Sequence, residues 1–229
     1  MVKSIFFDTG PLISLTMSRL LWVLPLLKEK FGGKFYITPA VKRELIERPL
    51  NIKRFSFEAL QALKLVKEGV LEVYTKVPEK KAAQLINLAN KSFFIGKKSL
   101  DVMQSGEIES IICALQEKSS AVVMDERTLR LFIENSSEMG KLLERRFHKK
   151  IQTNQNLMKS FSKQLQGISI IRSIELVSIA FKMGLLDGYI PQLRNGKRTL
   201  LDSVLWAVKF NGCSVTQQEI EEIEELLLK

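Results

Sequence analysis

The segment Val2-Lys3-Ser4-Ile5-Phe6-Phe7-Asp8-Thr9-Gly10-Pro11 decides the fold of this chain of 229 residues. An apolar run that ends in Asp, Thr, Gly and Pro predicts a short buried strand stopped by a turn. Leucines between positions 12 and 27 then recur at near-helical spacing until Gly32-Gly33, with a break expected at Pro25. The chain therefore opens with a strand and a helical segment.

The same alternation of strand and helix continues to about residue 133. Apolar runs at 34–37, 70–75 and 121–124 predict strands, and hydrophobic spacing predicts helices at 39–48, 57–68, from 78 onwards and at 105–118. Thr38 and Pro39 suit the N-cap and the first position of one helix. Residues 91–99 are expected to form a loop. This order predicts an α/β fold with a parallel sheet covered on both faces.

Residues 134–167 differ from the rest because they are polar and basic. Their weak helical pattern predicts an inserted helical arm, after which residues 168–171 return to the sheet and residues 173–183 form an apolar helix. We therefore expect one domain over residues 1–229, with the arm as an insertion within it.

The composition is that of a globular protein with a basic surface. Hydrophobic residues make up 45% of the chain, which excludes disordered and collagen-like classes, and the formal net charge is +10. Residues 1–133 carry 21 Lys and Arg against 14 Asp and Glu, which favours a polyanionic partner. The two cysteines lie far apart, and no apolar run is long enough to cross a bilayer. A cytoplasmic protein without a membrane contact is expected.

Four acidic residues occupy positions that this fold would bring together. Asp8 and Asp125 each follow an apolar run, at the carboxyl ends of parallel strands where open α/β sheets place their ligands. Glu44 lies on the helix after the second strand, and Glu107 lies in the first turn of a later helix. Clustered carboxylates repel one another unless a cation holds them, and an all-oxygen set suits Mg²⁺ or Mn²⁺.

Each acid also has a purely structural interpretation. Asp125 suits a helix N-cap, and Glu107 suits an acid that complements a helix dipole. Glu44 lies beside two basic residues and suits a solvated face, and Asp8 suits an Asx turn. The functional hypothesis depends on the order of the four acids taken together.

That order resembles the motif order of PIN-domain nucleases. The first strand of that family ends in an acidic residue followed by Thr and a small residue, as it does here. The tail from Ile174 to Leu186 is similar to the closing helix of a VapC-like archaeal and bacterial branch of the family. Four stretches carry the resemblance: Ile5–Leu15, Thr38–Leu45, Gly106–Ile111 and Val122–Arg127.

The resemblance implies a three-layer α/β/α sandwich in which Asp8, Glu44, Glu107 and Asp125 form a catalytic, metal-binding quartet. The implied reaction is hydrolysis of RNA phosphodiester bonds with Mg²⁺ or Mn²⁺. Thr9 is a candidate for a supporting hydrogen-bond donor. The resemblance also implies a homodimer and, for toxin members, a cognate antitoxin or another protein partner. Gly10 stands where many members have Ser, which removes a hydroxyl near the site.

Basic residues near these motifs are candidates for contacts with RNA. Lys97 and Lys98 lie beside two phenylalanines, so this segment either stacks bases and holds the backbone or tucks its aromatic rings into the core. The basic residues of the arm suit an RNA grip, a partner-docking hairpin or a solvated face. The full set of candidates is Lys97, Lys98, Arg127, Arg130, Arg145 and Arg146.

Three other functions compete with the nuclease hypothesis. A non-catalytic PIN-like scaffold would bind RNA or protein without cutting. An aspartic protease is suggested by the tripeptide Asp8-Thr9-Gly10, although such proteases resemble glycine-rich all-β folds and this chain has only 12 glycines. An aspartyl phosphatase is the most distant alternative, because the paired Asp-x-Asp is missing.

Overall fold

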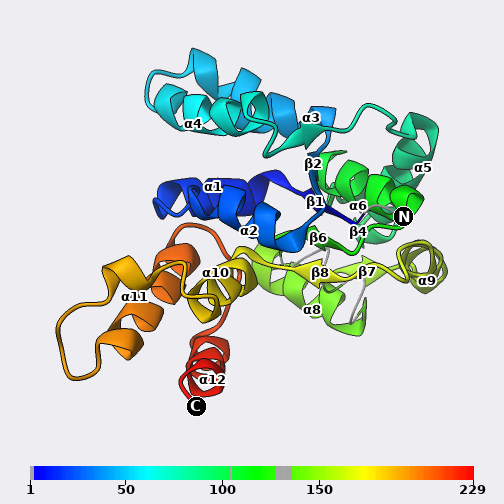
Figure 1. Cartoon of the computed structure of the whole chain (residues 1–229). Coiled ribbons are helices and arrows are strands. Elements are labelled where there is room, and N and C mark those ends of the chain that lie inside the picture. The colour runs from blue at the N-terminus through cyan, green and yellow to red at the C-terminus, as the bar shows by residue number, and fades with distance from the viewer. Residues whose placement is uncertain (1–2, 104, 127–130, 132–135) are drawn as a thin grey trace.

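The computed structural model describes the chain except for residues 1–2, 104, 127–130 and 132–135 (Figure 1). Its centre is a sheet of five strands in the order β3-β2-β1-β6-β8, and every neighbouring pair is parallel. The predicted parallel sheet is therefore confirmed, although its outer strands are short. The strands are β1 (Ser4–Phe7), β2 (Lys34–Ile37), β3 (Glu72–Val73), β6 (Ala121–Val123) and β8 (Ile170–Ile171).

Helices cover both faces of this sheet, as the alternation of side chains along β1 requires (Figure 1). Ile5 and Phe7 pack into one core and Phe6 packs into the other. The first core is formed with α1 (Thr9–Met17), α2 (Val23–Phe31), α4 (Ser56–Lys67), α10 (Ser173–Lys182), α11 (Gly196–Phe210) and α12 (Gln217–Leu227). The second is formed with α5 (Glu79–Asn90), α6 (Ser105–Glu117), α8 (Ser136–Phe147) and α9 (Gln155–Gln164). The three-layer sandwich is thus confirmed.

The helical segment after the first strand is broken before Pro25. α1 ends at Met17, and Arg19 adopts a positive φ of 58° between the two helices. Pro25 lies in the first turn of α2, where its missing N–H is not needed by the helix. The predicted break at Pro25 is therefore wrong in its position.

The helix predicted at 39–48 has three parts. Thr38 is its N-cap as predicted, because its side chain accepts from the Val41 amide. A regular turn α3 (Pro39–Lys42) leads into a π-helical turn η1 (Arg43–Glu47) and a 3₁₀ turn η2 (Pro49–Asn51). A further 3₁₀ turn, η3 (Asp187–Tyr189), precedes α11.

A second, antiparallel sheet replaces the loop expected at 91–99. It consists of β4 (Phe93–Ile95), β5 (Lys98–Ser99) and β7 (Gln152–Thr153), in the order β5-β4-β7. Gly96, with φ of 61°, opens the two-residue turn between β4 and β5. The described part of the segment predicted as a helical arm contains α8 and α9, and its strand β7 joins it to β4.

One functional alternative depends on the architecture. The aspartic-protease hypothesis required an all-β fold, and the α/β sandwich excludes it. Across the described residues, no helix combines the length and apolar character needed to cross a membrane.

Candidate active site

The site lies at the carboxyl edge of the central sheet, where three adjacent strands end together. Asp8 follows β1 directly, and its amide donates to the Val123 carbonyl over 3.0 Å. The Met124 amide donates to the Ile171 carbonyl over 2.8 Å, so the carboxyl ends of β6 and β8 also lie side by side. Asp125 and Ser173 follow these last two strands. Because parallel strands place their ends at one edge, Asp8 and Asp125 are held by rigid backbone.

The carboxyl of Asp8 is perturbed by its surroundings. Burial raises the pKa of its carboxyl from 3.8 to about 6. The backbone amides of Thr9 and Gly10 oppose this rise, whereas the carboxylates of Glu44 and Asp125 add to it. Three of the four predicted acids therefore interact electrostatically, and negative charge accumulates around a buried carboxyl.

Glu44 reaches the site from the π-helical turn η1, a type of turn that is frequent at functional sites. The Thr9 hydroxyl donates to Glu44 Oε2 over 2.9 Å, which is the kind of supporting contact expected of this residue. A Cβ at Gly106 would lie 3.3 Å from Glu44 Oε2. The Glu44 carboxylate therefore lies against the first turn of α6, where the next residue is the buried Glu107.

Asp125 is held by two serines that the sequence analysis did not identify. Its Oδ1 accepts from the Ser173 amide over 2.7 Å, and its Oδ2 accepts from the Ser173 hydroxyl over 2.8 Å and the Ser14 hydroxyl over 2.7 Å. Ser14 lies one helical turn after Gly10. Position 10 carries no hydroxyl, and the hydroxyl that reaches Asp125 from α1 is that of Ser14, which no local pattern in the sequence marks.

The start of α10 is fixed by an ion-pair network. The Arg172 guanidinium donates to Glu175 Oε1 over 2.9 Å and to Glu219 Oε1 over 2.7 Å. Arg172 also joins α10 to the Ser214 carbonyl. Because Ser173 follows directly, this network holds two of the three donors to Asp125, the amide and the hydroxyl of Ser173.

Neither cysteine suits a nucleophilic role. Burial raises the pKa of Cys213 to about 12, and the neighbouring Asp125 carboxylate adds to the rise. Burial likewise raises the pKa of Cys113 to about 12. Both thiols therefore stay protonated at neutral pH, which disfavours a thiolate nucleophile.

The donor set fits a hard divalent cation by its chemistry. All four predicted side chains offer carboxylate oxygens, and the charge around Asp8 is of the sign that a cation relieves. Among the residues that the structure describes, however, no three His, Cys, Asp or Glu side chains are grouped to hold a metal ion. The interactions of Asp8 with Glu44 and Asp125 thus bring three of the four predicted acids into one neighbourhood, and Glu107 is buried in the first turn of α6.

The predicted RNA-contacting residues fall into two groups. Lys97, Lys98, Arg145 and Arg146 are exposed, the lysines around the β4–β5 turn and the arginines on α8. Arg127 and Arg130 lie outside the described residues. Phe93 is fully buried in the second core, so of the two alternatives given for this ring the core position holds.

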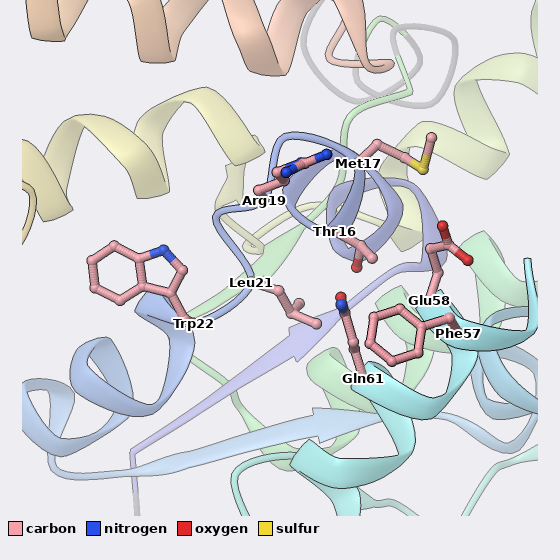
Figure 2. Close-up of a pocket in the computed structure, with 8 residues that line it drawn as sticks. All are labelled: Thr16, Met17, Arg19, Leu21, Trp22, Phe57, Glu58 and Gln61. Atoms are coloured by element: carbon pink, nitrogen blue, oxygen red, sulfur yellow. The ribbon is translucent and has the colours of Figure 1, made fainter. Parts of the chain in front are cut away.

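A separate pocket lies between α1 and α4 (Figure 2). Its volume is about 560 Å³, and its lining includes Met17, Trp22, Phe57 and Glu58. Glu58 Oε2 is buried there without a hydrogen-bond partner in the described structure. None of the four predicted acids lines this pocket, so it is distinct from the acidic edge.

The chain is thus an α/β protein with acidic residues at the carboxyl ends of its parallel strands, the edge where open α/β sheets place their ligands. A family model for the PIN domain matches residues 4–137, more than half of the chain, and the chain therefore belongs to the PIN-domain family. No curated protein matches the chain. The PIN domain is a nuclease fold, so the class of activity that the family supports is nucleic-acid hydrolysis. The match ends at the start of α8.

Proposed function

We propose that this protein is a metal-dependent endoribonuclease in which Asp8, Glu44, Glu107 and Asp125 form the active site. The observation that carries the proposal is the buried Asp8 carboxyl, whose pKa is raised further by Glu44 and Asp125 at the carboxyl edge of the sheet. Such crowding of like charges is costly for a purely structural role. It is the arrangement that a divalent cation stabilises.

Mg²⁺ or Mn²⁺, when bound, would neutralise charge on the phosphodiester and acidify a water molecule. The protein's own contribution is to hold the carboxylates in place. Asp8 projects from the end of a central strand, and Asp125 is held by the two serines. Thr9 holds Glu44 against α6. These supporting hydrogen bonds resemble those that orient ligands in metal sites.

The net charge of +10 suits a nucleic-acid substrate, and the choice of RNA follows from the resemblance to PIN-domain nucleases. The exposed cations Lys97, Lys98, Arg145 and Arg146 are the proposed backbone contacts. A homodimer and a cognate antitoxin or other protein partner belong to the same proposal and follow from the family resemblance.

The decisive experiment is cleavage of labelled single-stranded and structured RNA with Mn²⁺, Mg²⁺ or EDTA. Wild type should cleave only with a metal, and Glu44→Gln should lose at least about 100-fold in rate, by analogy with the loss of a charge-stabilising group in other enzymes. Glu225→Gln, an exposed residue of α12, is the matched control and should cleave like wild type. Equal cleavage by Glu44→Gln and wild type would refute this active site.

A non-catalytic RNA-binding scaffold is the second candidate. Two observations favour it: the described acids form no metal-holding group of three, and both oxygens of Asp125 already accept hydrogen bonds. The same assay separates the two functions. Tight RNA binding without cleavage in Mn²⁺ or Mg²⁺ would support the scaffold.

A further inference from the structure

We propose that Trp206, Lys209 and Phe210, at the end of α11, form a stacking site for a base of single-stranded RNA beside the acidic edge. This inference rests on the proposed ribonuclease function and adds a substrate-positioning site to it. The three residues lie beyond the part of the chain that the PIN-domain model matches. The site is therefore a property of this chain and not of the matched region.

The aromatic rings at the end of α11 are packed together, and one of them is exposed. Phe210 is 77% exposed, an unusual state for a large apolar side chain on a helix. Its ring centroid lies 5.3 Å from that of Trp206, with an interplanar angle of 31°. Because Trp206 is half-buried against the first core, it supports Phe210 from one side and leaves it open to a ligand.

A lysine ammonium group lies over one of these rings. Lys209 Nζ lies 4.4 Å from the centroid of the Trp206 ring. A cation over an aromatic ring, next to an open ring, offers a base a stacking surface and its phosphate a counter-charge. Sites that bind single-stranded nucleic acid without sequence preference combine these two features.

The end of α11 is connected to the acidic edge through α1. Phe210 is followed by Asn211, whose carbonyl oxygen lies 3.2 Å from the Ser14 hydroxyl that donates to Asp125. The Asn211 side-chain amide donates to the Ser18 hydroxyl, so the end of α11 is tied to α1. A Cβ at Gly212 would also lie 3.2 Å from Ser14 Oγ. Phe210 therefore lies directly before Asn211, whose carbonyl contacts the serine that donates to Asp125.

The surroundings favour a nucleic acid over a second copy of the chain. Thr199, Asp202 and Ser203, on the same helix, are exposed and polar. A stable dimer needs a broad interface, and lysines are depleted from the centre of such interfaces. Two aromatic rings with a lysine between polar neighbours match a single stacked base better than a dimer contact.

The test measures RNA binding in EDTA, so that cleavage does not enter the result. Fluorescence anisotropy of a labelled oligouridylate gives the affinity of wild type, Phe210→Ala and Phe210→Trp. Phe57→Ala is the matched control, because Phe57 is 67% exposed on α4. A Trp22→Phe background leaves Trp206 as the only tryptophan, so its fluorescence reports stacking directly.

We expect Phe210→Ala to weaken binding about tenfold, Phe210→Trp to restore it, and Phe57→Ala to match wild type. The RNA should also quench Trp206 fluorescence. In a plot of the logarithm of the binding constant against the logarithm of salt concentration, Lys209→Gln should reduce the magnitude of the slope by about one. Phe210→Ala should leave this slope unchanged.

Wild-type affinity in Phe210→Ala would overturn the proposal, as would a change from dimer to monomer on size-exclusion chromatography with RNA binding intact. The ribonuclease proposal fails separately. If binding depends on Phe210 but no metal supports cleavage, the stacking site stands and the catalytic assignment falls. If RNA is cut while Phe210→Ala binds normally, the reverse holds.

Discussion

Asp8→Asn should make the metal-free protein more stable while abolishing its activity. The Asp8 carboxyl is buried, and its pKa is raised from 3.8 to about 6 by burial first and by the neighbouring carboxylates second. The charged form is therefore destabilising in the folded state. An asparagine keeps the shape of the side chain and removes the charge, so the cost of holding that charge disappears.

The magnitude and the pH range follow from this pKa. The folded protein retains a proton on Asp8 between pH 3.8 and about 6, whereas the unfolded chain has lost it, so stability from this group is full below pH 3.8 and is lost as pH rises through 6. A rise from 3.8 to about 6 corresponds to about 3 kcal/mol. Asp8→Asn should thus unfold like wild type near pH 4 and exceed it by up to about 3 kcal/mol at pH 7.5.

Urea unfolding followed by circular dichroism, in EDTA at the two pH values, measures this difference. Addition of Mn²⁺ at pH 7.5 should then stabilise wild type, by about 2.7 kcal/mol at 100 times the dissociation constant, and leave Asp8→Asn unchanged. If Asp8→Asn is less stable than wild type at pH 7.5, or if both proteins respond equally to Mn²⁺, the description of this acidic edge is wrong.

Three further substitutions test the supports of the site. Ser173→Ala removes one donor to the Asp125 carboxylate and should lower the free energy of unfolding by about 2 kcal/mol, measured in urea at pH 7. An unchanged free energy of unfolding would show that this hydrogen bond does not stabilise the fold. Gly106→Ala places a Cβ 3.3 Å from Glu44 Oε2, so the fold should persist while calorimetry finds weaker Mn²⁺ binding; wild-type affinity would contradict this. Arg172→Gln breaks pairs with two partly exposed carboxylates and should cost about 2 kcal/mol, seen as a lower melting temperature; an unchanged melting temperature would show that the network is dispensable.

The central sheet and the positions of Asp8 and Asp125 were predictable because they depend on local sequence. A short apolar run marks each strand, and the acid directly after it marks the carboxyl edge. The supports of Asp125 were not predictable in this way. Ser173 meets Asp125 across 48 positions, and Ser14 meets it across 111, so only the folded chain brings these hydroxyls to the carboxylate.

The second sheet escaped prediction for a similar reason. β4 is three residues long and its partner β7 has two, so neither shows a clear alternation of polar and apolar residues. Their pairing joins Phe93 to Thr153, which are far apart in sequence. The burial of Phe93 depends on this pairing and on α9, which no local pattern around positions 91–99 records.

The pairing of β4 with β7 also bears on protein engineering. Deleting residues 134–167 to obtain a shorter protein would remove the strand that pairs with one edge of β4 and would expose the apolar side chains that pack against α8 and α9. Bare strand edges beside apolar surface recruit other chains. A truncated version is therefore expected to precipitate, which makes the basic segment a structural part of the protein that cannot be removed without loss of solubility.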